Sequence, residues 1–336
     1  MNSKKHQIDR KRDGALTIEL CDPDDGTPIR KLISVAGDLL AITDKSIFLT
    51  QLADDVDPER TNINVPNIHR KELNYGFKNE VVQRIFLLAE AMFDKTHLGY
   101  DRDCEAAIAS AWDATKLLLE MQEIQQGFKT EIDKIVEKGL LPDVGRSQNI
   151  PSVNSLETGI HTFAKKADQV RGIAVQFIKL FYKPEPGKKV IEKLEAAISL
   201  QHGENSQMLA FYQNFMPFIR FLRNLRNAIE HPNADEQLVV LDFHPTPEIT
   251  IDPPTLELIH PATPQERINI ISFMEQLVES LVDILEVLII NLCANNLGHF
   301  GKFECAVGAI EGERAEGRGV RYSYFVKLNN EWQPLG

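Results

Sequence analysis

Arg226, Asn227 and His231 lie close together in a segment with helical periodicity, and their side chains suit chemistry at a phosphodiester. A histidine titrates near neutral pH, so His231 can serve as general base or general acid. The guanidinium of Arg226 can hold two phosphate oxygens and stabilise the charge that develops on them. The amide of Asn227 can orient the imidazole or hold a phosphate oxygen. On a helix Asn227 and His231 share one face, and Arg223 extends it. These residue types favour metal-free cleavage of RNA. Arg226, Asn227 and His231 are the catalytic candidates.

An arginine ridge runs toward this motif. Arg220, Arg223 and Arg226 recur at every third position, and no acidic residue lies within 205–229. The chain as a whole has a formal net charge of −12, which argues against bulk electrostatic attraction to nucleic acid. A local basic ridge in such a chain is the best candidate for a phosphate track. Arg220 and Arg223 are therefore the candidate RNA-binding residues.

A structural interpretation of the same residues competes with the catalytic one. Arg226 and Glu230 have the spacing of an ordinary ion pair on a helix surface. His231 precedes Pro232, and a helix is expected to stop there. A histidine at a helix C-terminus is stabilised by the helix dipole without any further role. The sequence leaves both interpretations open.

Length and composition limit the class of protein. The 336 residues can form one large domain or two moderate ones, and a hydrophobic content of 43% excludes global disorder. The four cysteines include no C-x-x-C pair and the histidines no H-E-x-x-H, so we expect reduced thiols and neither a zinc site nor a cofactor. The apolar stretch 268–292 carries acidic residues at helical spacing, and residues 1–12 contain no apolar run. These features predict a cytoplasmic protein without a membrane span or signal peptide.

Helical periodicity dominates the middle of the chain, whereas strand-like patterns occur nearer its ends. Residues 39–43 and 46–52 form either a β-hairpin or one helix. Other strand-like stretches are 16–20, 239–244, 248–251, 255–259, 302–309 and 320–328. The predicted helices cover 79–95, 102–138, 155–182, 188–201, 205–231 and 264–295.

These patterns predict a mainly α fold. Its centre is a helical bundle over 76–295, with a β insertion at 237–262 between the last two bundle helices. Residues 1–14 are predicted to be a disordered basic tail, 15–75 a small α/β segment and 296–336 a C-terminal β-hairpin.

The R-N-x-x-x-H pattern at Arg226, Asn227 and His231 resembles the signature of the HEPN superfamily. The order of the helices resembles that family too, because the motif ends the penultimate bundle helix and an apolar helix follows. The β insertion and the terminal β segments depart from the family pattern. The resemblance implies a HEPN-like bundle, a metal-independent endoribonuclease that leaves 2′,3′-cyclic phosphate ends, and a role as a toxin or antiviral defence effector. It also implies a homodimer whose two copies form one cleft, with Arg226 stabilising the phosphate, Asn227 as its polar neighbour and His231 as acid and base.

Two other functions stay open. The chain can be a non-catalytic helical dimerisation module that binds a protein or nucleotide partner, since many members of the family have lost catalysis. A regulatory partner protein fits either reading. The R-N-x-x-x-H pattern can also be an accident in a structural protein. Loss of RNA cleavage on replacing His231 would separate the first function from the other two.

Overall fold

The computed structural model describes residues 6–13, 20, 26–99, 101–138, 149–184, 189–247, 250–298 and 303–335. Of these described residues, 53% are helical and 19% are in strands, and the strands form four small antiparallel sheets. The fold is therefore mixed α and β, and the prediction of a mainly α, HEPN-like bundle with small β additions is wrong. The strand content was underestimated because several strands, such as β9 (Gln265–Asn269, sequence QERIN), have no alternation of apolar and polar residues.

A four-stranded antiparallel meander forms the N-terminal part of the structure. Its strands are β1 (Lys31–Val35), β2 (Asp38–Ile42), β3 (Ile47–Gln51) and β4 (Ile68–Leu73). Leu40 of β2 faces Leu49 of β3, so the predicted hairpin is confirmed and the alternative helix across it is wrong. The predicted strand at 16–20 lies outside the described residues, apart from residue 20.

Part of the tail that the sequence predicts to be disordered is a short helix. α1 (Gln7–Asp13) is held on the loop that follows β3, where α2 (Ala53–Val56) lies. Arg12 donates to Asp54 and to Asp57, each at 2.7 Å, and only 6% of its side chain is exposed. The charge of Arg12 is therefore neutralised by the acidic loop, and this contact holds α1 in place.

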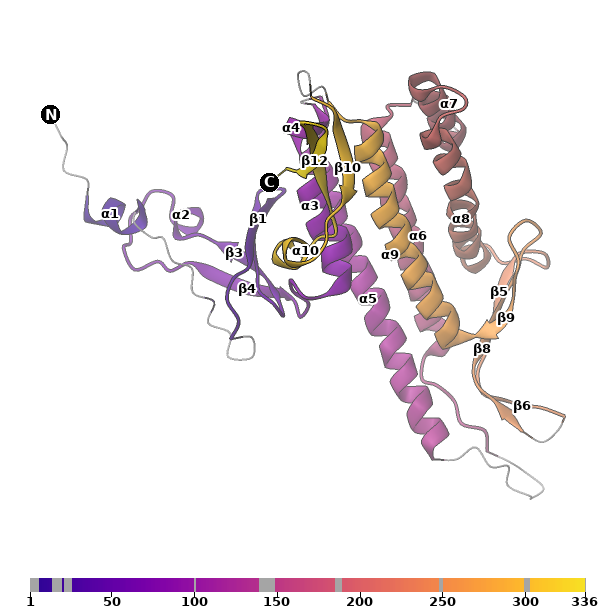
Figure 1. Ribbon diagram of the computed structural model, residues 1–336. Helices are drawn as coiled ribbons and strands as arrows, with labels where there is room; N and C mark the ends of the chain where they lie inside the picture. The colour runs from indigo at the N-terminus through magenta and orange to yellow at the C-terminus, as the bar shows by residue number, and fades with distance from the viewer. Residues whose placement is uncertain are drawn as a thin grey trace.

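The long helices lie alongside one another at the centre of the molecule (Figure 1), where α5 packs on α6 and α9, and α6 packs on α8. Their buried residues have the predicted spacing: on α6 they include Ile160, Phe163, Ala167 and Val170. That stripe explains why the segment is helical, since only a 3.6-residue repeat puts all of them on one face. The helices are η1 (Val82–Leu87, a π-helix), α3 (Leu88–Met92), α4 (Lys95–Leu98), α5 (Cys104–Glu137), α6 (Leu156–Phe181), α7 (Val190–His202), α8 (Gln207–Glu230) and α9 (Ile270–Asn295).

The β insertion between α8 and α9 is longer than predicted. β5 (Gln237–Leu241), β8 (Thr255–Ile259) and β9 form one sheet, and β6 (His244–Pro245) pairs with β7 (Ile251–Asp252). Residues 265–269 are therefore a strand, not the first turn of the predicted helix. α9 begins where the Asn269 side chain accepts from the amides of Ile271 and Ser272, at 3.0 and 3.2 Å. An Asn side chain at that position replaces the missing helical acceptors. No helix in the described part of the chain is both long and apolar enough to cross a membrane.

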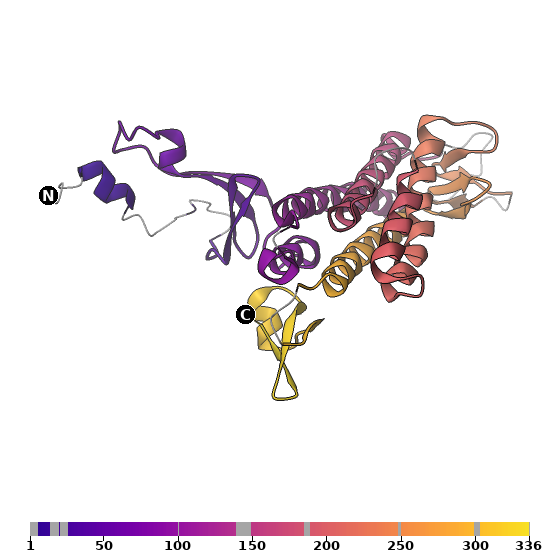
Figure 2. The same ribbon diagram turned by 90° about the horizontal axis from the view of Figure 1, so that it is seen from above.

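The C-terminal hairpin is confirmed and is larger than expected. β10 (Cys305–Ala309) pairs with β11 (Tyr322–Leu328), β12 (Glu331–Pro334) adds a third strand, and α10 (Glu313–Arg318) lies in the connection. Tyr324 donates its hydroxyl to the carbonyl of Met92 at the end of α3. This sheet packs against α3 and α9, far from the β insertion (Figure 2).

Gly76 lies where the chain passes close to the β2–β3 turn, and we expect Gly76→Ala to destabilise the protein by about 1–3 kcal/mol. A Cβ there would lie 2.4 Å from the Thr43 carbonyl oxygen and 2.5 Å from the Ser46 nitrogen, which are backbone atoms that cannot rotate away. Gly172→Ala is the matched control, because nothing lies within 4 Å of its Cβ and the change should stabilise α6 by about 0.5–1 kcal/mol. Urea unfolding measures the stability of both variants. If Gly76→Ala is as stable as wild type, the prediction is wrong.

Asp44 at the same turn makes stability depend on acid pH. Arg30 and Lys78 contact its carboxylate at 2.7 and 3.0 Å and lower its pKa from 3.8 to about 2. Because the folded pKa lies below the unfolded one, this stabilisation is present above about pH 4 and is lost as the pH falls through 2. Asp44→Asn should therefore be less stable than wild type at pH 6, and the gap should close toward pH 2. A gap that is constant from pH 6 to pH 2 would disprove the linkage.

Candidate active site and cationic cavity

The helix that carries the motif is anchored by an apolar face and by a cap at its start. Ser206 accepts a hydrogen bond from the Leu209 amide at 3.2 Å, which satisfies one of the free donors of the first turn. Leu222 and Leu225 are 1% exposed and lie on the face that packs against the core. The exposed residues of α8 therefore lie on its other side.

Arg220 and Arg223 are both exposed, as the sequence led us to expect for an arginine ridge. Neither has an ion pair with a carboxylate of the described residues. Arg226 is different, because its guanidinium is paired with Glu230 and donates to Oδ1 of the Asn227 side chain at 3.5 Å. The ion pair of the structural interpretation is thus formed in the single chain.

His231 lies just past the end of α8. Its amide still donates to the Asn227 carbonyl at 2.8 Å, but its backbone, at φ −135° and ψ 54°, has left the helical conformation. The helix repeat therefore no longer sets the direction of its side chain, and the single face expected for Arg223, Asn227 and His231 is regular only as far as Asn227. The His231 side chain is exposed. Within the described chain, no hydrogen bond joins the His231 imidazole to Arg226 or Asn227.

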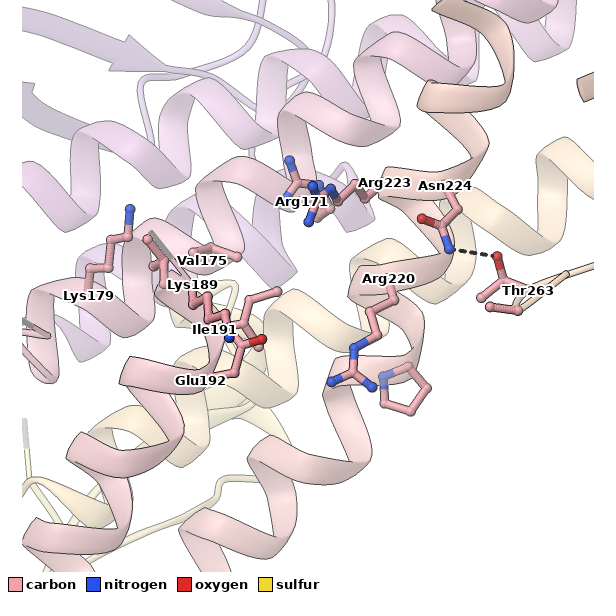
Figure 3. Close-up of a pocket in the computed structure, with 13 residues that line it drawn as sticks. Arg171, Val175, Lys179, Lys189, Ile191, Glu192, Arg220, Arg223, Asn224 and Thr263 are labelled. Carbon is pink, nitrogen blue, oxygen red and sulfur yellow. Dashed lines mark hydrogen bonds between the residues drawn. The ribbon is translucent and has the colours of Figure 1, made fainter. Parts of the chain in front are cut away.

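A cavity of about 820 Å³ lies beside the arginine ridge, between α6, the start of α7 and α8 (Figure 3). Five of the side chains that line it are cationic and one, Glu192, is anionic. The cations are Arg171 and Lys179 of α6, Lys189 before α7, and Arg220 and Arg223 of α8. Arg226, Asn227 and His231 do not line it. Two of the five candidate residues are thus in the cavity, and the three catalytic candidates lie outside.

Two hydrogen bonds fix the walls of this cavity. Tyr212 of α8 donates its hydroxyl to the carbonyl of Ile191 at 2.7 Å, which ties the start of α7 to α8. Burial raises the pKa of Tyr212, so the phenol keeps its proton and remains a donor. Asn224 donates to the Thr263 hydroxyl at 3.1 Å, which ties α8 to the turn before β9 (Figure 3).

Sequence reasoning missed Arg171, Lys179 and Lys189. Arg171 and Lys179 belong to α6, and Lys189 follows Lys188 just before α7, so none of them shares a segment with the arginines of α8. No local pattern distinguishes them from ordinary surface cations, because their proximity to Arg223 arises only when α6, α7 and α8 pack together.

Comparisons with family models, curated proteins and solved structures found no match to this chain.

Proposed function

We propose that the protein is a metal-independent endoribonuclease that acts as a homodimer. The observation that supports this most is the exposed arginine ridge of α8, which leads from Arg220 and Arg223 toward Arg226 and ends at the exposed His231. In a chain with a net charge of −12, such a ridge is a local site for phosphates and not a general attraction for polyanions.

The reaction needs only groups that two copies of this chain carry between them. The ribose 2′-oxygen attacks the adjacent phosphorus while His231 takes the 2′-hydroxyl proton. The bond from phosphorus to the 5′-oxygen then breaks, and a second acid gives the leaving oxygen its proton. Arg226 and Asn227 donate hydrogen bonds to the phosphate oxygens as their negative charge increases. The products are a 2′,3′-cyclic phosphate and a 5′-hydroxyl.

A second copy of the chain would provide the acid that this mechanism needs. One imidazole cannot take a proton and supply one in the same step, and each chain offers one His231 at this end of α8. Arg226 is also held by Glu230 within its own chain. A homodimer would bring a second His231 and a second Arg226 to one cleft, so that the two histidines serve as base and acid.

Incubation of the purified protein with a defined RNA in EDTA tests this function. We expect fragments that end in 2′,3′-cyclic phosphate, and no cleavage where the ribose at the scission site is 2′-deoxy. Light scattering should give the mass of a dimer. Activity that disappears in EDTA, or cleavage of the 2′-deoxy substrate, would exclude the mechanism, and a monomer would exclude the shared cleft.

A non-catalytic binding module is the second candidate, and the cationic cavity favours it. The cavity gathers five cations without including any of the three catalytic candidates. A protein that only binds a phosphorylated partner can do so with such a cavity and does not require His231 as an acid or base. Under that function RNA stays intact in every condition, and His231→Ala binds the ligand as wild type does.

A further inference from the structure

We propose that the cavity between α6, α7 and α8 binds an oligophosphate, a chain of two or three phosphate groups such as nucleoside triphosphates or inorganic tripolyphosphate carry. This site goes beyond the proposed RNA cleavage: it shares Arg220 and Arg223 with the arginine ridge, but the three catalytic candidates, Arg226, Asn227 and His231, lie outside its lining.

The charge of the lining selects a multiply charged anion. Five cationic side chains and one carboxylate line the cavity. One of the cations, Arg171, is partly neutralised, because its Nε lies 2.5 Å from a carboxylate oxygen of Asp168. Lys179, Lys189 and the two arginines of α8 have no ion pair with any carboxylate of the described residues. Cations that converge on one cavity repel one another unless an anion lies between them.

Backbone amides at the start of α7 add donors to the same cavity. Lys189 caps this helix with φ 65° and ψ 50°, and its side chain offers no acceptor to the first turn. The amides of Val190, Ile191 and Glu192 therefore have no partner within the helix, and these three residues line the cavity. The first turn of a helix of 13 residues adds a partial positive charge that favours phosphate.

The size and walls of the cavity indicate a small ligand. Its volume of about 820 Å³ lies in the range of about 300–1,000 Å³ that is usual for small-molecule sites. Apolar side chains of Val175, Val190 and Pro217 line it together with Asn224. Because the cations come from three separate segments and surround a hollow, they enclose a compact anion; a polymer track would need them in a line along one surface.

Calorimetric titration of the full chain tests the proposal with three probes: ATP, inorganic tripolyphosphate and AMP. We expect ATP and tripolyphosphate to bind, and AMP to bind at least about tenfold more weakly, because it offers one phosphate to the cations. Tighter binding of ATP than of tripolyphosphate would identify a nucleotide as the source of the phosphate chain, and equal binding would identify the phosphate chain alone as the ligand. Absence of binding by both, or AMP binding as tightly as ATP, would overturn the proposal.

Matched variants locate the site. Lys179→Ala and Lys189→Ala should each weaken ATP binding about tenfold, since each removes a charged partner of the phosphates. Glu192→Gln should strengthen it, because the one lining carboxylate repels the ligand. Lys165→Ala is the control, an exposed lysine of α6 outside the lining. Circular dichroism confirms that the variants fold. Equal ATP affinity in all four variants would place binding elsewhere and refute the cavity.

RNA binding and cleavage, measured on the same variants, separate this proposal from the proposed ribonuclease. Lys179 and Lys189 are not part of the arginine ridge of α8, so RNA cleavage can fail while ATP binding persists, and the reverse. If RNA binds, ATP does not, and Lys179→Ala weakens RNA binding, the cavity belongs to the RNA track and the oligophosphate proposal is wrong.

Discussion

His231→Ala is expected to reduce RNA cleavage in EDTA by at least about 100-fold, which is the usual size of the contribution of a general acid or base. Arg226→Ala should cost a similar factor, because it removes a charged donor from the phosphate in the transition state. Cleavage of a fluorescent RNA, followed under single-turnover conditions, measures both. Binding of the uncleaved RNA to His231→Ala should be unchanged, since the imidazole acts on the proton and not on the bound phosphate.

Two controls make this result specific. His161→Ala removes a histidine on the surface of α6, whose ring lies 3.9 Å from Glu157, and should leave cleavage unchanged. Glu230→Gln removes the carboxylate that holds Arg226 in the single chain and should increase the cleavage rate. If His231→Ala and His161→Ala cleave RNA as fast as wild type does, His231 has no catalytic role. If Glu230→Gln lowers the rate, the ion pair positions Arg226 and does not restrain it.

Arg84→Met is expected to lower the free energy of unfolding by about 3–5 kcal/mol, the largest stability effect that we predict. Arg84 in η1 contacts Glu286 at 2.7 Å and Asp283 at 2.6 Å, both on α9. The side chains of Arg84 and Glu286 are 12% and 8% exposed. Methionine would leave the Glu286 carboxylate buried without its partner, and that desolvation is the main cost. Urea unfolding at pH 7 measures it.

A double variant and a surface variant test this cause. Arg84→Met with Glu286→Leu should recover much of the loss, because no buried charge is then left unpaired. Arg70→Met breaks a pair with Glu72 in which the arginine is 69% exposed, and should cost less than about 1 kcal/mol. If the double variant is no more stable than Arg84→Met, the loss comes from packing and not from the unpaired carboxylate.

The helices were predictable because their signal is local. The period of buried residues on α6 is a property of neighbouring turns, so residues 155–182 could be recognised without any knowledge of what covers them. The strands were less predictable. β9 has no alternation, and it is a strand because β8 lies beside it to pair with its backbone, with Leu256 opposite Ile268. Pairing of that kind depends on a partner strand, and a mainly α fold was predicted for this reason.

The candidate site was likewise predictable in part. The residue types and order of Arg226, Asn227 and His231 are properties of one segment, and so is the ridge that Arg220 and Arg223 begin. The contacts that these residues make are not properties of one segment. Sequence spacing allowed both a catalytic arginine and an ion pair with Glu230, and the folded chain forms the ion pair. The end of the helix at Glu230 then places His231 beyond the helical repeat.

The sequence by itself determined which residue types lie together: one motif with a titratable imidazole and a guanidinium that can donate hydrogen bonds, on a helix whose period and end could be predicted from neighbouring residues. Only the tertiary structure decided which charges meet. Arg171, Lys189 and Arg223 line one cavity because three helices pack there, and Arg84 lies against Glu286 across 202 positions of the chain. The physical reason is range: hydrophobic periodicity and capping act within a few turns, whereas electrostatic contact depends on distances in space that only the packing of the helices sets.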